Sequence, residues 1–285
     1  MYTIPPKKMV IINILDILKK YSDMDHRLTQ AQIIEILKKE YYMDVDRRTV
    51  KRNLMNLLDF DFGIDYTEII KKNEKGEEIP ICTDWYITRE FDDSEIRLLI
   101  DSVLFSKTIP QKQCKKLIDK LKGLSNIYFE KKVNHICSLP EIRPENKELF
   151  YTIDVLDEAI SKGKKVSFIY NSYGTDKKLH PKREREYVIN PYQMVATNGR
   201  YYLICNYDKY DTLSNYRIDR ITGIKMMNEK RKSIKELKEG EINLPKHMAE
   251  HLYMFAGESI RVKFKAKNYI IDQIIDWFGF GPKIT

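Results

Sequence analysis

The chain has 285 residues and a mass of 34.0 kDa, enough for about two or three domains at the usual ~100–200 residues each. Hydrophobic residues make up 42% of it and aromatic residues 11%, which argues against extended disorder. The net charge of +8 favours a polyanionic partner. No apolar run is long enough to cross a bilayer, and the N-terminal segment is not a signal peptide. The four cysteines are scattered, which indicates neither a disulfide framework nor a zinc cluster, so we expect a cytoplasmic protein.

The N-terminal part of the chain is predicted to form three short helices. The first is expected over Lys8–Tyr21, and the second begins with a capping box made by Thr29 and Gln32. Asp46 opens the third. The positions that recur at helical spacing, and that we expect to be buried, are Val10, Ile14, Ile17, Leu18, Ile33, Ile36, Leu37, Val50, Leu54 and Leu57.

The third helix carries a basic surface at its N-terminal half, away from its apolar face. In a helix-turn-helix, side chains at this end of the second helix reach base edges in the major groove, and arginine pairs bidentately with guanine or phosphate. The alternative is a solvated basic face on an ordinary helical bundle. We predict DNA contacts from Arg47, Arg48, Thr49, Lys51 and Arg52.

Residues Asp65–Thr88 are predicted to form a hairpin that follows the three helices as a wing does. Its turn is expected at Glu74, Lys75 and Gly76. Lys71 and Lys72 place positive charge near the tip, and Lys72 is our candidate for a phosphate contact there. Acidic neighbours dilute that charge: Glu74, Glu77 and Glu78.

The segment Ser94–Tyr128 again has helical spacing, with Pro110 separating two helices. We interpret it as a connector and as a candidate dimer surface. A further helix is predicted over Phe150–Ser161.

A small β-unit is predicted after Gly163. Its first strand is Val166–Tyr170, and Asn198-Gly199 is a strong signal for a type I′ hairpin turn. Five short strands with tight turns in about 60 residues indicate a small barrel, which closes its own edges. The later strands are predicted at Tyr187–Pro191, Tyr192–Ala196, Tyr201–Asp208 and Asn215–Ile221.

The C-terminal part is predicted to hold one strand, Ser259–Lys267, and one amphipathic helix, Asn268–Gly279. A strand and a helix make only half a domain, so we expect a partner strand to be lacking.

Two motifs of this chain resemble those of bacterial transcription regulators that join an N-terminal winged helix-turn-helix to a WYL domain. The triplet that names the family stands here as Tyr201-Tyr202-Leu203, and its closing strand pattern stands as Tyr216-Arg217-Ile218-Asp219-Arg220-Ile221. Ser214 occupies a position where the family often has arginine. The recognition-helix pattern matches Asp46–Leu54, with Asp46 in place of serine and Asn53 in place of aspartate.

The resemblance implies an α+β multidomain protein with an Sm-like or SH3-like five-stranded β-barrel and a partial α/β C-terminal extension. It implies a transcriptional regulator that binds a double-stranded DNA operator and is controlled by an anionic effector on the barrel, with single-stranded nucleic acid as one candidate. We also expect a homodimer, because one winged helix offers a small interface and specific sites usually need two. The predicted domains are a winged helix-turn-helix over 1–90, a helical connector over 91–147, the WYL domain over 148–228 and the start of the extension over 229–285.

Composition supports an anionic ligand for the barrel independently. Between Lys162 and Val188 there are eight Lys or Arg against three acids, with tyrosines between them, and single-stranded nucleic acid needs both stacking and phosphate neutralisation. The alternative is that half of these tyrosines are core residues. The candidate ligand-binding residues are Tyr170, Lys182, Arg183, Tyr202, Arg217 and Arg220.

Strand geometry separates the two arginines of the closing strand. Residues two apart share a face, so Arg217 and Arg220 point to opposite sides of an ideal strand. Arg217 is the stronger candidate, since Tyr216 and Ile218 are expected to point inward beside it. At least one of the two arginines is expected to serve structure by pairing with a nearby acid, either Asp219 or Asp208.

Other functional classes have weaker support. We find no nucleophile elbow, P-loop or dinucleotide fingerprint, so we expect neither an enzyme nor a cofactor. His247 and His251 have a spacing that can hold a metal, but no third ligand follows at a recognisable distance, and no metal site is predicted. The remaining alternative is an accessory protein of a defence system that binds single-stranded nucleic acid.

Overall fold

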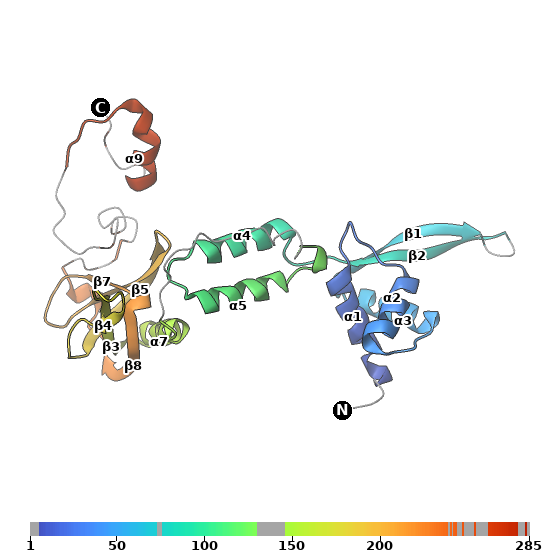
Figure 1. The fold of residues 1–285 in the computed structure, drawn as a ribbon, viewed down its shortest axis with the longest axis horizontal. Coiled ribbons are helices and arrows are strands. Elements are labelled where there is room, and N and C mark those ends of the chain that lie inside the picture. Colours follow the sequence, from blue (N-terminus) through green and yellow to red (C-terminus); the bar gives the residue numbers. More distant parts are fainter. Residues whose placement is uncertain are drawn as a thin grey trace. The chain divides into compact units, whose positions relative to one another are not determined.

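The computed structural model describes residues 6–72, 76–129, 146–238 and 262–278, and the isolated positions 240, 242–243, 247, 254 and 283 (Figure 1). The chain divides into two compact units. Unit 1 holds Met1–Leu104 and Cys114–Pro140, and unit 2 holds Phe105–Gln113 and Glu141–Thr285. Each unit is described by itself below.

Unit 1 begins with three helices that the sequence predicted. A single 3₁₀ turn, η1 (Lys7–Met9), leads into α1 (Val10–Tyr21), which is followed by α2 (Gln30–Tyr41) and α3 (Arg47–Asp59). The capping box is confirmed: Thr29 Oγ1 accepts from the Gln32 amide at 3.3 Å, and Gln32 Oε1 accepts from the Thr29 amide at 2.8 Å. The Asp46 carboxylate accepts from the Thr49 amide at 2.9 Å. These side chains satisfy amides that a helix start leaves without partners.

The three helices bury their apolar faces in one core. Nine of the ten predicted positions are buried there, and Ile36 is half-buried against them. Trp85, from the hairpin that follows, is fully buried in the same core. A backbone bridge holds it, because Leu28 and Trp85 exchange two hydrogen bonds of 2.8 Å. The helices and the base of the hairpin therefore share one hydrophobic cluster.

The predicted hairpin is formed by β1 (Ile64–Lys72) and β2 (Glu78–Ile87), which pair antiparallel. Figure 1 shows it extending well beyond the three helices as a two-stranded ribbon. Two of the residues predicted for its turn, Glu74 and Lys75, lie outside the described residues.

Two further helices, α4 (Asp93–Phe105) and α5 (Gln111–Lys122), lie side by side in Figure 1. Pro110 stands immediately before α5, as its fixed φ and missing amide hydrogen favour. The predicted pair of connector helices is confirmed.

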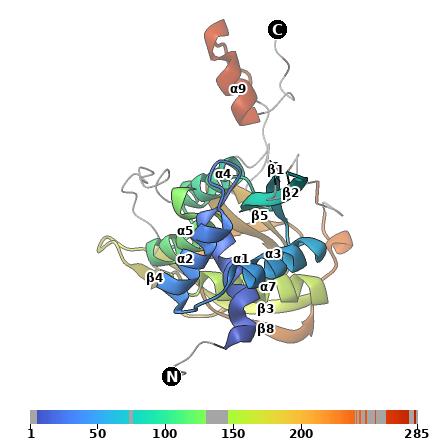
Figure 2. The ribbon, with the colours of Figure 1, turned by 90° about the vertical axis from the view of Figure 1, so that its right-hand side faces the viewer.

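Unit 2 is built around α7 (Leu149–Lys162) and a curled antiparallel sheet. Figure 2 shows α7 beside β3 and β8. The hydrogen-bonded order is β4-β3-β5-β6-β7, and β8 also pairs with β3. The sheet curls as a half-barrel and has six strands in the described part of the chain, one more than predicted, because the short strand β4 was not foreseen. η2 (Ile218–Arg220) joins β7 directly to β8. The strands are β3 (Lys164–Tyr173), β4 (Leu179–Pro181), β5 (Tyr187–Thr197), β6 (Arg200–Asn206), β7 (Ser214–Arg217) and β8 (Ile221–Lys230).

Two of the predicted strand boundaries were wrong. The segments predicted as two strands before the turn are one strand, β5, with a register shift between Pro191 and Gln193. A bulge of this kind bends a strand without ending it. The closing segment, predicted as one strand, is broken by η2 into the end of β7 and the start of β8.

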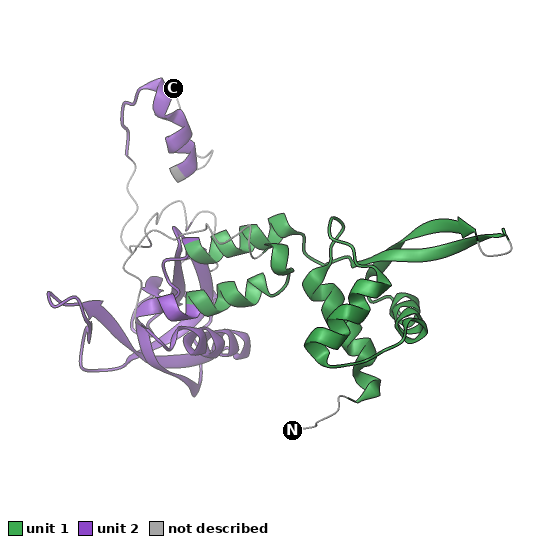
Figure 3. Cartoon of the chain, turned by 45° about the vertical axis from the view of Figure 1, so that its right-hand side comes forward, with its two compact units in different colours: residues 1–104, 114–140 green, residues 105–113, 141–285 purple. Residues whose placement is uncertain are grey.

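The hairpin turn at Asn198-Gly199 is confirmed, with φ of 51° and 71°. Residues 105–113, which include the connection between α4 and α5, belong to unit 2 (Figure 3). They contact this turn. The Lys107 amide donates to the Gly199 carbonyl at 2.6 Å, and the Tyr201 amide donates to Thr108 Oγ1 at 3.0 Å. The turn is therefore fixed to the helical connection.

The two faces of β6 pack into different cores. Leu203 and Cys205 belong to the core between α7 and the concave side of the sheet. Tyr202 and Ile204 point the other way, as alternation requires, into a second core. That second core is completed by residues after β8: Ile234, Leu237, Ile242 and Met254.

The predicted C-terminal helix is confirmed as a 3₁₀ turn, η4 (Asn268–Ile270), followed by α9 (Ile271–Phe278). Another 3₁₀ turn, η3 (Ile234–Glu236), lies after β8. The strand predicted over Ser259–Lys267 was wrong for its described part, because residues 262–267 have no regular structure. An alternating sequence forms a strand only beside another strand, and none pairs with these residues in the described part of the chain.

Candidate functional site

The basic surface of α3 is on the exposed side of the helix, because Val50, Leu54 and Leu57 occupy the buried side. The cations predicted to contact DNA are all exposed: Arg47, Arg48, Lys51 and Arg52. The last three make no side-chain hydrogen bond or ion pair with any residue that the structure describes. Their charges are therefore available to a partner.

Two of the predicted contacts are already engaged within unit 1. Arg47 Nε donates to Gln30 Oε1 at 2.9 Å, which ties the start of α3 to the start of α2. Thr49 Oγ1 donates to Asp46 Oδ2 at 2.7 Å. This hydrogen bond lowers the pKa of the Asp46 carboxyl and keeps the cap ionised. The Thr49 hydroxyl must give up its hydrogen bond to the cap before it can donate to a phosphate.

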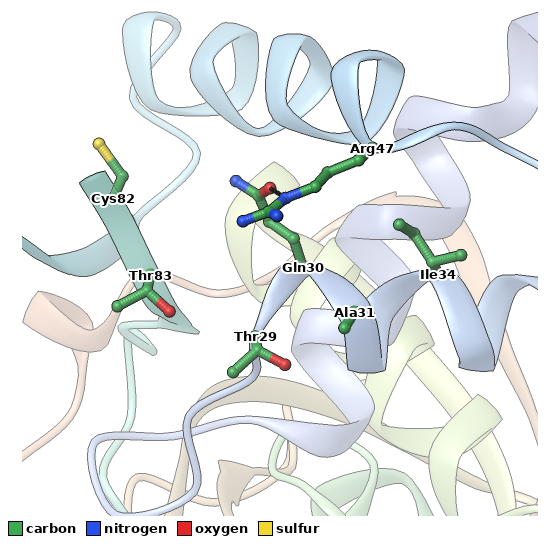
Figure 4. A pocket seen from close by; sticks show the side chains of 7 residues that line it. All are labelled: Thr29, Gln30, Ala31, Ile34, Arg47, Cys82 and Thr83. Carbon is green, nitrogen blue, oxygen red and sulfur yellow. Dashed lines mark hydrogen bonds between the residues drawn. The ribbon is translucent and has the colours of Figure 1, made fainter. Parts of the chain in front are cut away.

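A pocket of about 300 Å³ lies beside these helix starts. Figure 4 shows Arg47 reaching from α3 toward Gln30 of α2, with Cys82 and Thr83 of β2 across from them. Nothing in the sequence marked Gln30 or Cys82, because the pocket exists only where α2, α3 and β2 meet.

The end of the hairpin carries balanced charge. Lys71 and Lys72 are exposed at the end of β1, but Lys72 stands opposite Glu78 in the ladder. The predicted phosphate contact by Lys72 stays a prediction.

In unit 2, the candidate Arg217 is paired internally. Its Nε and Nη2 donate to the two carboxylate oxygens of Asp219 at 3.0 and 2.6 Å. The Arg217 side chain is 17% exposed and that of Asp219 is 1% exposed. Burial acts to lower the pKa of the guanidinium, but the hydrogen bonds to Asp219 outweigh it and raise the pKa.

The arginine that pairs with an acid is therefore Arg217, which the sequence favoured as the ligand contact, and its partner is Asp219, one of the two acids that the sequence left open. The other acid, Asp208, pairs with Lys165 at 2.8 Å, and it accepts a hydrogen bond of 2.8 Å from the side-chain amide of the buried Asn190. These hydrogen bonds, first from Asn190 and then from Lys165, hold the pKa of the Asp208 carboxyl below its ordinary value.

Arg220 has no acidic partner among the described residues. Its guanidinium carbon lies 5.8 Å from the ring centre of Tyr173. Its buried Nε has no hydrogen-bond acceptor in the described part of the chain. The 3₁₀ turn that carries it explains why it does not follow strand alternation with Arg217.

The two tyrosine candidates are buried in different cores. Tyr170 is 9% exposed in the concave core, and its hydroxyl accepts from the Arg217 amide at 3.4 Å. Burial raises the pKa of its phenol. Tyr202 is 8% exposed in the second core and stands directly opposite Arg217 in the β6–β7 ladder, so these two side chains leave the sheet on the same face. The Tyr170 ring lies in the other core and contacts Arg217 through the Arg217 backbone amide.

Lys182 and Arg183 are exposed in the segment between β4 and β5. The Lys182 amide donates to the Tyr170 carbonyl at 2.8 Å, which places this segment beside the concave core. The Arg183 guanidinium carbon lies 3.4 Å from the ring centre of Tyr187 and 5.7 Å from that of Tyr207.

An aromatic cluster that the sequence did not single out surrounds this arginine. Tyr187 is stacked parallel to Phe168 at 5.7 Å, and the Tyr207 and Tyr216 hydroxyls lie 2.8 Å apart. Burial raises the pKa of both phenols, so they are neutral at ordinary pH. The residues come from β3, β5, β7 and the loop after β6, and only the curl of the sheet brings them together.

The metal alternative has no support in the described residues. His247 Nε2 lies 3.2 Å from Asn215 Oδ1, and His251 lies outside the described residues. The described residues hold no group of at least three His, Cys, Asp or Glu suited to a metal ion. No described helix is both long enough and apolar enough to span a membrane.

Comparison with known proteins identifies one domain within unit 2. No curated protein matches it. Among solved structures it is similar to the proteasome accessory factor B/C (PafBC) of Arthrobacter aurescens, with 11% identity and a TM-score of 0.26. That similarity covers 82% of this chain and 38% of PafBC, and a TM-score this low carries no inference. The family model for the WYL domain matches residues 151–226, so the part of unit 2 that holds most of α7 and the curled sheet is a WYL domain.

Proposed function

We propose that this protein is a DNA-binding transcriptional regulator whose WYL domain binds an anionic effector. The observation that carries the proposal is the exposed basic face of a capped α3, followed by a hairpin, in a chain that also holds a WYL domain. In this proposal the first three helices and the β1–β2 hairpin form a winged helix-turn-helix. The chain acts by binding, without catalysis and without a cofactor.

The arrangement of cations on α3 supports recognition of base pairs in double-stranded DNA. Arg48, Lys51 and Arg52 stand at spacings of three and four, so they share one side of the helix. Recognition helices place such residues against base edges in the major groove. Arg47, tied to Gln30, is better placed to position the helix than to read a base.

The distribution of charge in the WYL domain supports an anionic effector. Asp219 neutralises Arg217, whereas Arg220 and Lys182 have no acidic partner in the described residues. We therefore assign the first contact with the effector to Arg220 and Lys182, and give Arg217 the role of holding η2 in place.

Selection of bound sequences from a random duplex library tests the proposal directly. Recovery of one enriched motif supports sequence-specific operator binding. Arg52→Ala should then weaken binding to that motif by about 1–3 kcal/mol. Lys162→Ala, which removes an exposed cation from α7 in the WYL domain, serves as the control matched in charge and should leave affinity unchanged. Equal affinity of the Arg52 variant and the wild type, with both folded, contradicts the assignment of α3.

We further propose a homodimer on a two-fold operator, because a single winged helix offers a small interface and specific sites usually use two. The α4–α5 pair offers a candidate contact surface, since Leu98 and Phe105 are each 68% exposed. A protein that stays monomeric at micromolar concentration and binds one copy per operator contradicts this.

A second candidate function is an accessory protein that binds single-stranded nucleic acid for a defence system. The aromatic cluster beside Arg183 favours it. Competition between duplex and single-stranded DNA of the same sequence separates the two, since a regulator prefers the duplex operator and an accessory protein prefers the single strand.

A further inference from the structure

Arg183 occupies one side of an aromatic ring that could otherwise bind a ligand. Tyr187 is stacked against the fully buried Phe168 with an interplanar angle of 1°. The Arg183 guanidinium lies 3.4 Å from the Tyr187 ring centre, and it comes from an exposed segment. Tyr187 is therefore packed by a ring from inside the WYL domain and covered by a cation from the solvent side, and it is 7% exposed with this cation in place.

The Arg183 side chain is held only weakly over the Tyr187 ring. Residues 182–186 have no helix or strand. Besides the ring contacts, the Arg183 side chain makes one hydrogen bond, from Nη2 to the Glu186 carbonyl at 3.3 Å, which is longer than the usual N–H···O distance. No acidic side chain among the described residues pairs with it. A ligand that offers the ring a better contact can displace this arginine at small cost.

The two rings that Arg183 covers have the chemistry of a stacking site. The Tyr187 and Tyr207 ring centres are 6.3 Å apart and the planes are tilted by 47°, and Arg183 contacts both rings. The Tyr207 hydroxyl is already bonded to that of Tyr216, which leaves the ring faces as the available surface. A nucleobase is planar like a guanidinium, and base–aromatic stacking tolerates any sequence.

We propose that Tyr187 and Tyr207 form a stacking site for one nucleobase of a single-stranded nucleic acid, and that Arg183 closes this site in the absence of ligand. The inference rests on the proposed anionic effector and names its subsite. When the base enters, Arg183 leaves the ring and becomes available to a phosphate of the same strand. Exposed cations without acidic partners in the described residues lie close by in the chain: Lys182, Arg185 and Lys209.

Two oligonucleotides of equal length separate stacking from charge: a thymidine strand, and an abasic strand with the same phosphates. Arg183→Ala should raise the affinity for the thymidine strand relative to the abasic strand on the order of five-fold, a factor typical of losing one cation–π contact at a partly exposed site. Arg185→Ala removes the same charge two residues away without touching the rings. It should weaken binding of both strands by the same factor.

Tyr207→Leu provides the second variant. Because Tyr207 is only half-buried, this substitution is expected to leave the fold intact. Placed on the Arg183→Ala background, it should abolish the preference for the thymidine strand. Far-UV circular dichroism and the thermal midpoint check that each variant is folded.

The outcomes distinguish this inference from the function on which it rests. If the wild type binds the strands but Arg183→Ala and Arg185→Ala change the two affinities in the same way, the inference of a stacking site is wrong and the effector proposal stands. If neither the wild type nor any variant binds either strand, nucleic acid is not the effector and the inference falls with it.

Discussion

At the scale of single residues, the ion pair between Arg217 and Asp219 shows how one contact changes the interpretation of a motif. Both residues belong to the pattern that marks the family, and Asp219 is almost fully buried. A buried carboxylate is tolerated only when it is paired and hydrogen-bonded. The pair therefore holds η2 between β7 and β8, and it reduces the charge that Arg217 can offer to a ligand.

Asp219→Asn should destabilise the WYL domain by about 3–5 kcal/mol, because it leaves a buried guanidinium without its counter-charge. Asp211→Asn is the matched control: Asp211 pairs with Lys232 at 2.8 Å, but its side chain is 58% exposed. Exposed pairs contribute about 0–1 kcal/mol. Urea unfolding followed by circular dichroism measures both, and similar losses for the two variants would refute a structural role for Asp219.

At the scale of elements, the β5–β6 hairpin links the sheet to the connection between α4 and α5. Its turn needs Gly199 for two reasons. The residue has a φ of +71°, and a Cβ there would lie 2.9 Å from the Phe105 carbonyl oxygen. The turn therefore has to be glycine both for its own geometry and for the close approach of residues 105–113.

Gly199→Ala should destabilise unit 2 by more than the about 1–2 kcal/mol that a left-handed conformation costs by itself. Gly163→Ala is the control, since Gly163 has a φ of +62° and no atom within 4 Å of its added Cβ. The difference between the two variants measures the clash with Phe105. Amide exchange at Lys107, which donates to Gly199, should also become faster in the Gly199 variant only. Equal unfolding free energies would show that the contact adds nothing.

At the scale of the whole molecule, the proposed effector and operator sites lie in different compact units. Residues 105–113 are the part of the helical connection that packs with the WYL domain, and the helices on either side run into unit 1.

Addition of effector should change operator affinity by about 5–150-fold, the usual range of allosteric coupling. Linkage requires the operator to change effector affinity by the same factor. Fluorescence anisotropy with labelled operator, and then with labelled single-stranded oligonucleotide, measures both directions. An operator affinity that is unchanged at saturating effector contradicts regulation, even if each site binds its own ligand.

Local patterns predicted much of this protein. The capping box of Thr29, the cap of Asp46 and the Asn198-Gly199 turn each depend on residues within a few positions, so the sequence alone specified them. Helical spacing likewise predicted the core of unit 1. Bonds and periodicities that involve near neighbours do not depend on how distant segments pack.

Only the tertiary structure decided which face of the WYL domain is available to a ligand. Tyr202 packs under residues that follow β8, Asp219 rather than Asp208 pairs with Arg217, and Arg183 covers Tyr187. The break at η2 that separates Arg217 from Arg220 depends on where the sheet ends. These features follow from the curl of the sheet, which brings together side chains that are far apart in the chain. No local pattern of residues predicts such long-range contacts.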